Sequence, residues 1–220
     1  MSKVRSSLSS AQLAELASKQ VNSFFPDLNQ VVPGQLAVSV EKSLERVEHC
    51  FTNIDNRYFF DGENAVFNHL HGDQYAMWLY ILANEHFIIT GEVNVCEKLF
   101  LLNKALHGCD IFYEVRLPSI FLLVHPLGTV LGRGDYQDYL MVYQRCGVGS
   151  NHDIYPKLGR HLTLRPGASV LGRSTVGDNC VIAADGLLID RVVGEDLVYF
   201  GGPSDFKTRP NVEKEKIWRT

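Results

Sequence analysis

Apolar residues recur at every sixth position through the second half of the chain, and this period restricts the fold more than any other feature of the sequence. The series consists of Leu158, Leu164, Val170, Val176, Ile182 and Leu188. Four positions after each stands a mostly small residue, in the set Leu162, Ala168, Ser174, Cys180, Gly186 and Val192. The same period occurs earlier in the chain, at Val124, Val130, Val142 and Val148. Four extra residues are inserted between Val148 and Leu158.

A period of six indicates a β-helix built from hexapeptide units. In this interpretation each unit is a short strand and a turn, the apolar residue points inward, and the small residue relieves crowding at the corner. Three units close a coil of about 18 residues, and the coils stack about 4.8 Å apart. A β-sandwich does not produce this pattern, because its strands alternate with a period of two. The period alone does not give the handedness of the coil.

The first half of the chain has helical spacing instead. We expect helices over residues 11–25, 35–54, 73–90 and 93–107, with serines capping the first helix and Gly108 ending the last. Pro33-Gly34 predicts a break before the second helix, and residues 53–72 predict turns. The predicted fold class is α+β, with a helical domain at 1–109, a parallel β-helix at 110–208 and a tail at 209–220.

Charge and cysteine content narrow the class of function. The formal net charge of -4 argues against a nucleic-acid partner, since such proteins carry basic patches. The sequence has no run of eighteen apolar residues and no apolar leader, so we expect no membrane association. The five cysteines form no C-x-x-C pair, which favours reduced thiols and a cytoplasmic location. We expect no metal site, because His69 and His71 have no third ligand placed near them.

Four segments match, in order, the motifs of one enzyme family. Residues 125–133 (H-P-L-G-T-V-L-G-R) look like H-A-T-G-V-V-I-G-E, and residues 142–149 (V-Y-Q-R-C-G-V-G) look like I-L-Q-x-V-T-L-G. Residues 155–159 (Y-P-K-L-G) are similar to H-P-K-I-G, and residues 201–204 (G-G-P-S) to G-V-P-A. Over roughly residues 105–208 the chain therefore resembles the serine acetyltransferases, a family of hexapeptide-repeat acyltransferases.

The resemblance implies a fold, a co-substrate and an assembly. The fold is a helical domain followed by a left-handed β-helix. Acetyl-CoA is the co-substrate, with no permanently bound cofactor, and the acceptor is a small hydroxyl compound such as L-serine, a step in cysteine biosynthesis. The assembly is a homotrimer or a dimer of trimers, with acetyl-CoA between neighbouring subunits.

The resemblance also assigns His125 as the catalytic base and Asp110 as its partner, because the family's aspartate precedes its histidine by the same 15 residues. A hydroxyl must lose its proton as it attacks a thioester, and an imidazole with an ordinary pKa of about 6.5 can accept it at neutral pH. A carboxylate on the other ring nitrogen fixes the tautomer and stabilises the imidazolium. By family position, Gly149 and Ser150 are the candidate oxyanion donors.

Acetyl-CoA is expected along the final coils, where backbone groups around Ala168, Ala183 and Ala184 would meet the pantetheine arm. Lys207 and Arg209 either bind the CoA phosphates or belong to a solvated basic tail, and the sequence leaves both interpretations open. Cys146 falls on a small inward position, which predicts a structural thiol rather than a nucleophile.

The acceptor site is where the chain departs from the family. The family's aspartate before the catalytic histidine is Val124 here, and its Arg-His pair is Ile154-Tyr155, so charges that would bind an amino acid zwitterion are missing. We expect Val124, Tyr143, Asn151 and Tyr155 around the acceptor. Three functions stay open: acetylation of serine or a serine-like compound, acetylation of a sugar or nucleotide sugar in surface polysaccharide synthesis, and a non-catalytic β-helix scaffold.

Overall fold

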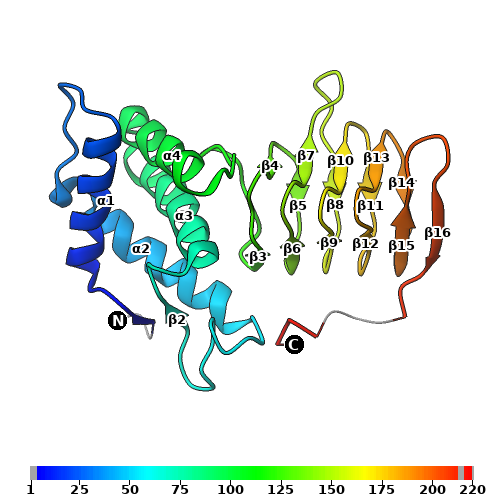
Figure 1. The fold of residues 1–220 in the computed structure, drawn as a ribbon, viewed down its shortest axis with the longest axis horizontal. Coiled ribbons are helices and arrows are strands. Elements are labelled where there is room, and N and C mark those ends of the chain that lie inside the picture. Colours follow the sequence, from blue (N-terminus) through cyan, green and yellow to red (C-terminus); the bar gives the residue numbers. More distant parts are fainter. Residues whose placement is uncertain (1–3, 213–215, 220) are drawn as a thin grey trace. The chain divides into compact units, whose positions relative to one another are not determined.

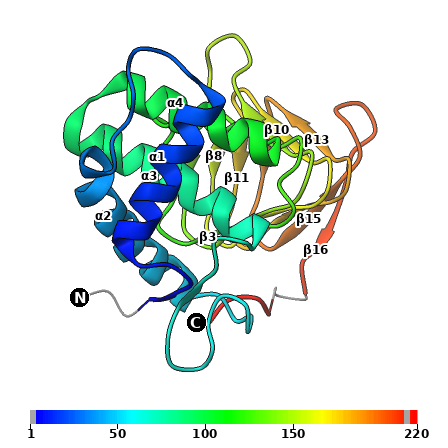
Figure 2. The same cartoon turned by 60° about the vertical axis from the view of Figure 1, so that its left-hand side comes forward.

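The computed structural model describes residues 4–212 and 216–219, which form two compact units. The first unit comprises described residues 4–107, 112–114 and 219, and the second comprises 108–111, 115–212 and 216–218. The helices lie in the first unit and a stack of short strands in the second (Figure 1, Figure 2). The domain boundaries expected at 109/110 and 208/209 stay predictions, although a strand of the second unit runs on to Pro210.

The helices have the bounds α1, Ser10–Phe24; α2, Pro33–Thr52; α3, Gly72–Thr90; and α4, Val93–His107. Every predicted helix is therefore confirmed to within two residues at each end. The serine run caps α1 as predicted, because the Ser9 hydroxyl accepts the Gln12 N–H at 3.3 Å while the Ser9 N–H donates to the Gln12 side chain at 2.9 Å. The predicted break at Pro33-Gly34 is wrong. Pro33 begins α2, where the N–H that it lacks has no partner in any helix.

Helix α3 forms the core of the first unit and packs against both α2 and α4. Its residues from Tyr75 to Ala83 are all buried. Two polar contacts fix it: Trp78 Nε1 donates to Ser43 Oγ at 2.9 Å, and Asn103 Nδ2 donates to the Ala76 carbonyl at 3.0 Å. In the stretch predicted as turns, a two-residue strand β2, Val66–Phe67, pairs in parallel with β1, Arg5–Ser6. Two-residue strands have no period, so the sequence did not indicate this pair.

The second unit is a β-helix with three sheets, which successive strands visit in turn. Sheet I holds β3, Phe121–Leu123; β6, Leu140–Val142; β9, Thr163–Leu164; β12, Val181–Ile182; β15, Leu197–Phe200; and β16, Lys207–Pro210. Sheet II holds β4, Val130–Leu131; β7, Gly147–Gly149; β10, Ser169–Leu171; and β13, Leu187–Ile189. Sheet III holds β5, Asp135–Tyr136; β8, Lys157–Leu158; β11, Thr175–Val176; and β14, Val192–Val193. All pairings are parallel except that of β15 with β16.

The inward positions follow the predicted period through the middle of the stack. Each residue from Leu158 to Leu188 in the six-residue series is at most 2% exposed. Leu164 pairs with Ile182, so one coil contains 18 residues, as predicted. The predicted four-residue insertion follows β7.

The predicted inward residues Val142 and Val148 are buried, whereas Val130 is wrong by one position: it is 49% exposed and Leu131 is 1% exposed. At the other end Val192, predicted as one of the small corner positions, is 79% exposed, and Val193 is 4% exposed. Val124 is half-buried, and Leu123 takes the inward place with 0% exposure. The cause is that connections between strands differ in length at these ends, so the strict period of six fails there.

Glycines explain how closely the coils stack at the corner between sheets III and I. A Cβ on Gly159 would lie 2.6 Å from the Gly177 backbone, and a Cβ on Gly177 would lie 2.6 Å from the Glu195 nitrogen. Only glycine fits there without moving the next coil. In the described part of the chain, no helix is both long enough and apolar enough to span a bilayer.

Candidate active site

Four connections stack on one another at the corner where the chain passes from sheet I to sheet II. They are residues 124–129, 143–146, 165–168 and 183–186, and the strand register on both sides aligns them. Main-chain hydrogen bonds join neighbouring connections, for example Gly167 N–H to the Gln144 carbonyl at 3.0 Å and Asp185 N–H to the Pro166 carbonyl at 2.9 Å. The corner is therefore a ladder whose rungs lie about one strand spacing, 4.8 Å, apart.

His125 is the second residue of the first connection and is exposed. This connection has two residues more than the other three, and His125 has a positive φ of 50° in addition to the left-handed Gly128. The other connections have one left-handed residue each: Arg145, Gly167 and Asp185. A non-glycine residue in this region carries backbone strain, and strain of this kind concentrates at functional sites. The lengthened connection thus presents the imidazole at the surface of the corner.

Asp110 lies beside the strand that follows this connection. It forms a parallel bridge with Val130, its N–H donates to the Thr129 carbonyl at 2.9 Å, and its carbonyl accepts from the Leu131 N–H at 2.9 Å. One coil below the connection, Gly108 accepts from the Gly128 N–H at 2.9 Å. Residues 108–110 therefore underlie the end of the His125 connection, with Asp110 beside Val130, and the pairing of Asp110 with His125 stays a prediction.

The connections after His125 carry a column of side chains in corresponding places. Counted from the end of the sheet I strand, the first places hold Val124, Tyr143, Arg165 and Ala183, and the second places hold His125, Gln144, Pro166 and Ala184. Because the first connection is longer, the main-chain hydrogen bonds place Leu127 level with Gln144: the Arg145 N–H donates to Leu127, as the Gly167 N–H donates to Gln144. Arg165 Nη1 donates to Tyr143 Oη at 3.2 Å, and its guanidinium carbon lies 5.3 Å from the Tyr143 ring centroid. The predicted acceptor residues Val124 and Tyr143 are thus at the same corner as His125. The Arg165 partner of Tyr143 was not predicted.

The three alanines expected along the pantetheine arm differ in what their backbone groups can offer. The Ala168 N–H already donates to Arg165, and the Ala168 carbonyl accepts from Gly147. The Ala183 N–H likewise donates to Tyr199, and the Ala183 carbonyl accepts from Gly186. Ala168 is also fully buried, whereas Ala184 is exposed. The peptide group of Ala184 is therefore the best placed of the three to bind a ligand.

The predicted oxyanion donors and two predicted acceptor residues lie at a different corner. Gly149 ends β7, and the inserted loop after it leads from sheet II to sheet III (Figure 1). In this loop Asn151 and Ile154 form an antiparallel bridge, and Asn151 Nδ2 donates to Asp190 Oδ2 at 2.7 Å. Ser150 and Tyr155 flank the bridge. Because strand β7 separates the two corners by about 10 Å, one chain does not bring these residues to His125.

Lys207 and Arg209 both lie on β16, which closes the end of sheet I as an antiparallel edge strand. The Arg209 guanidinium carbon lies 5.5 Å from the Phe200 ring centroid, and both basic side chains are exposed. They are ordered strand residues beyond the last coil. An exposed edge position is open to a phosphate ligand, and it is equally open to solvent.

Other groups with reactive side chains are structural. Cys146 is 1% exposed, and burial raises the pKa of its thiol to about 11, as predicted for a structural cysteine. In the first unit Ser39 Oγ lies 2.9 Å from His86 Nδ1, and His86 Nε2 lies 3.3 Å from Glu92. This Ser-His-Glu arrangement resembles a hydrolytic triad, but Ser39 and His86 are at most 1% exposed, so no substrate reaches them.

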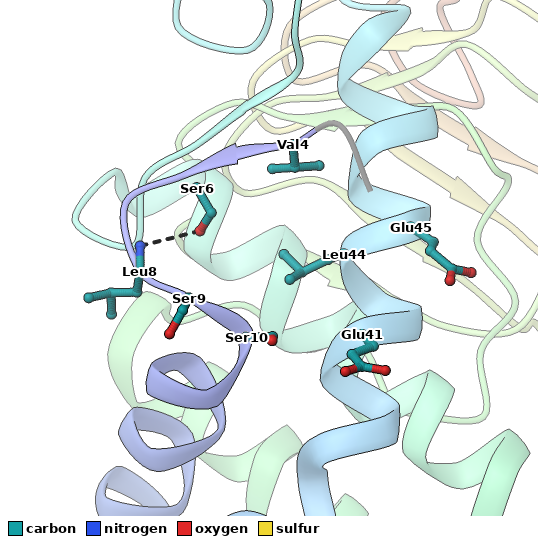
Figure 3. A pocket seen from close by; sticks show the side chains of 8 residues that line it. All are labelled: Val4, Ser6, Leu8, Ser9, Ser10, Glu41, Leu44 and Glu45. Carbon is teal, nitrogen blue, oxygen red and sulfur yellow. Dashed lines mark hydrogen bonds between the residues drawn. The ribbon is translucent and has the colours of Figure 1, made fainter. Parts of the chain in front are cut away.

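A pocket of about 720 Å³ in the first unit is a second candidate for an active site, but its lining does not suit catalysis (Figure 3). Its lining consists of hydroxyl, carboxylate and aliphatic side chains from the first strand, the start of α1 and the middle of α2: Val4, Ser6, Leu8, Ser9, Ser10, Glu41, Leu44 and Glu45. None of these described lining residues carries an imidazole, thiol or basic group that could activate a nucleophile. Within residues 4–212 and 216–219, no three His, Cys, Asp or Glu side chains are grouped to hold a metal ion.

Known proteins resemble this chain in sequence and in fold. No family model matches the chain. A serine acetyltransferase of Synechococcus elongatus is 27% identical over 138 residues, which cover 60% of this chain and 56% of the relative. The chain spans about half the length of the curated relatives that it matches, 56% of this one and 38% of another.

Solved serine acetyltransferases share the fold. The crystal structure from Neisseria gonorrhoeae has a TM-score of 0.70 at 19% identity, with 94% of this chain and 80% of that chain covered. The crystal structure from Brucella abortus in complex with coenzyme A has a TM-score of 0.67 at 16% identity, with 95% and 85% covered. These matches confirm the resemblance to serine acetyltransferases and the predicted fold class, helices followed by a left-handed β-helix.

Proposed function

We propose that this chain is an acetyl-CoA-dependent O-acetyltransferase that acts on the hydroxyl of a small acceptor, with L-serine or a serine-like compound as the first candidate. One observation carries the proposal: a lengthened connection, in which His125 is left-handed, presents the imidazole at a β-helix corner, and the main chain of Asp110 is bonded beside Val130 at the end of that connection. The likeness to serine acetyltransferases in sequence and fold supports it.

In the proposed reaction His125 is the general base and Asp110 orients it. The imidazole takes the hydroxyl proton as the acceptor oxygen attacks the thioester carbonyl carbon. The tetrahedral oxyanion then collapses, the carbon–sulfur bond breaks, and the imidazolium returns its proton to the leaving thiolate. The products are the acetyl ester and free CoA, and the Asp110 carboxylate stabilises the imidazolium between the two proton transfers.

We propose further that the working site needs more than one copy of the chain, in a homotrimer or a dimer of trimers. His125 and the four stacked connections proposed to bind acetyl-CoA lie at the sheet I–II corner. The next corner holds the candidate oxyanion donors and two candidate acceptor residues: Gly149, Ser150, Asn151 and Tyr155. A threefold arrangement would bring the second corner of one subunit beside the first corner of its neighbour. The oxyanion donors and part of the acceptor pocket would then come from that neighbour.

Acetyl-CoA would lie along the ladder, with its thioester beside His125 and its arm passing Ala184 toward β16. The distance from the first to the fourth connection is three strand spacings, about 14 Å, which suits an extended pantetheine arm. Lys207 and Arg209 would then bind the phosphates by charge-assisted hydrogen bonds. A cytoplasmic location fits this co-substrate and the five free cysteines, all of which are buried.

The acceptor pocket gives a second candidate some support. The positions where the family carries charges hold Val124, Ile154 and Tyr155, so an uncharged sugar hydroxyl would meet no unpaired charge there. Acetylation of a sugar or nucleotide sugar is therefore the competing activity. A non-catalytic scaffold is the third possibility.

The test is release of free thiol from acetyl-CoA with L-serine, other hydroxyl amino acids, and nucleotide sugars as separate acceptors. Turnover with serine alone would reject the sugar hypothesis, and turnover with sugars alone would reject serine. Absence of both turnover and CoA binding would leave only the scaffold.

The same assay tests the base. We expect His125→Ala to lower kcat by two orders of magnitude or more, the scale of a lost general base. The exposed His49 on α2 offers the matched control, and His49→Ala should keep the full rate. A near-normal rate in His125→Ala would show that the base is another residue.

A further inference from the structure

A column of side chains lies on the outer face of sheet I, where its strands end at the sheet I–II corner. Each member follows a fully buried strand residue, so the alternation of a strand turns its own side chain outward. Main-chain hydrogen bonds keep the column in register, because the Val124 N–H donates to the Val142 carbonyl at 2.8 Å and the Tyr143 N–H donates to the Leu164 carbonyl at 3.0 Å. The column consists of Val124, Tyr143, Arg165 and Ala183, in successive coils.

The column starts next to His125, the proposed general base. His125 directly follows Val124, so the two Cα atoms are about 3.8 Å apart. The Tyr143 Cα lies one coil from Val124, about 4.8 Å away and roughly at right angles to the chain direction. The Cα atoms of His125 and Tyr143 are therefore about 6 Å apart. A molecule whose hydroxyl meets the imidazole is within reach of a side chain as long as tyrosine.

Tyr143 and Arg165 form a pair of hydrogen-bond donors in this column. Arg165 Nη1 donates to Tyr143 Oη at 3.2 Å, and the guanidinium carbon lies 5.3 Å from the ring centroid. Because Oη accepts from Arg165, the phenol proton is left to donate, and nothing in residues 4–212 and 216–219 accepts it. A guanidinium carries five N–H donors in a rigid fork, more than one phenol oxygen can accept. Both side chains are half-buried, so a ligand can touch them.

The charge of the column suits an anion. Arg165 stays protonated at any working pH, and none of the four members of the column is a carboxylate. The carboxylate of Asp185, at the same corner, lies 3.6 Å from Arg145 and is paired there. We propose that Tyr143 and Arg165 together bind an anionic group of the acceptor, a carboxylate or a phosphate, while His125 takes the hydroxyl proton. The inference rests on the proposed function and assigns the chemical class of its acceptor.

The phosphates of CoA do not account for this pair. In the proposed function the thioester lies beside His125, and the CoA phosphates lie beyond the last coil, near Lys207 and Arg209. Tyr143 and Arg165 stand only one and two coils from Val124, about 5 and 10 Å along the stack. The acceptor is the co-substrate that meets these coils together with the imidazole. Its anionic group supplies the oxygens that the phenol and the guanidinium can hydrogen-bond.

The experiment uses acceptors in matched pairs, one member with the anionic group and one without it. L-Serine is paired with L-serinamide, which lacks the carboxylate. UDP-N-acetylglucosamine is paired with the methyl glycoside of N-acetylglucosamine, which lacks the diphosphate. Thiol release from acetyl-CoA gives kcat and KM, and a compound that binds without turnover is measured by its inhibition constant. A response in the serine pair assigns a carboxylate, and a response in the sugar pair assigns a phosphate.

The variants are Arg165→Met and Tyr143→Phe in the full chain. Arg165→Met should raise KM for the anionic member about ten- to hundredfold, the effect of a lost hydrogen bond to a charged group, with kcat within about threefold of wild type. The KM values for the neutral member and for acetyl-CoA should not change. Tyr143→Phe keeps the ring and should raise KM for the anionic member about five- to tenfold. Arg165→Lys keeps the charge without the fork and should restore part of the affinity.

The first unit offers a matched control pair. Arg57 Nη2 donates to Tyr58 Oη at 3.0 Å, and the Arg57 guanidinium carbon lies 5.0 Å from the Tyr58 ring centroid. This pair repeats the contact of Arg165 with Tyr143 but does not belong to the sheet I–II corner. Arg57→Met should therefore leave the KM for every acceptor and for acetyl-CoA at the wild-type value.

The other outcomes separate the inference from the proposed function. An equal rise in KM for charged and neutral acceptors, a rise confined to acetyl-CoA, or a wild-type enzyme that uses both members of each pair equally well overturns the inference and leaves the acetyltransferase intact. A melting temperature several degrees lower in Arg165→Met, with the same loss on both members, assigns the pair a structural role and also overturns it. Absence of turnover with every acceptor in the wild type overturns the proposed function, and the inference with it.

Discussion

Replacing His125 by glycine should remove activity while leaving the stability of the fold almost unchanged, and the two effects can be estimated from the structure. His125 is exposed and has a φ of 50°. A left-handed conformation costs a non-glycine residue about 1–2 kcal/mol, and glycine adopts it without strain. Glycine loses about 0.5–1 kcal/mol through the entropy of its more flexible unfolded state. These two backbone contributions sum to a gain of about 0.5 kcal/mol in the free energy of unfolding, which the loss of the imidazole's own interactions offsets.

The effect on the reaction is large by comparison. Loss of a general base lowers kcat by about a hundredfold or more, which corresponds to about 2.7 kcal/mol in the activation free energy. The assays are urea denaturation for stability and thiol release for kcat. A catalytic residue thus gives an inactive but fully stable variant, a combination that a structural histidine cannot give.

The control is a second left-handed residue on the sheet III–I corner. Asn179 has a φ of 55°, and Asn179→Gly should keep the wild-type kcat. The reasoning is refuted if His125→Gly keeps kcat within threefold of wild type. It is also refuted if the variant loses more than about 1 kcal/mol of stability, because His125 would then hold the corner together.

Two further predictions concern stability. Burial holds the pKa of His86 below its ordinary value, with Glu92 opposing the shift, so the unfolded chain binds the proton more readily than the folded chain. The stability of the first unit should therefore be complete above about pH 6.5 and fall as the pH drops through that value; a stability that is flat between pH 7.5 and 5.5 in urea denaturation would contradict this. Leu164 is fully buried in the middle coil, and Leu164→Ala should cost about 2–5 kcal/mol in the same assay, whereas a loss below 1 kcal/mol would show that the coil interior is loosely packed.

The repeat made the middle of the β-helix predictable because each inward side chain there meets the same environment. From Leu158 to Leu188 the connections have equal lengths, so a period of six finds every buried residue. Near His125 the period fails, since two extra residues lengthen one connection and neighbouring apolar residues hide the shift. Val130 and Leu131 are equally apolar in sequence, and only the register shows that Leu131 faces inward.

The candidate site was predictable only in part, for a similar reason. The motif and the spacing predict His125 and Asp110 as the catalytic pair, and the backbone places Asp110 beside Val130, on the strand that follows the His125 connection. The sequence did not separate Tyr143 from Asn151 and Tyr155, because residues at different corners can be close along the chain. It also gave no sign that Arg165 donates to Tyr143, since that contact depends on the register of neighbouring coils.

Main-chain hydrogen bonds hold the connections at the sheet I–II corner at a constant spacing. The side chains that these connections expose can therefore be replaced without changing the spacing. A substitution at Tyr143, Gln144 or Ala184 changes the side chain that one connection exposes, and the backbones of the neighbouring connections keep their positions. Residues inside the coils are buried and stabilise the fold, whereas residues on the outer edge are, under the proposed function, those that contact the ligand. Under the proposed function, such a chain can change its acceptor when a few edge residues are replaced, while the spacing along the bound thioester arm stays constant.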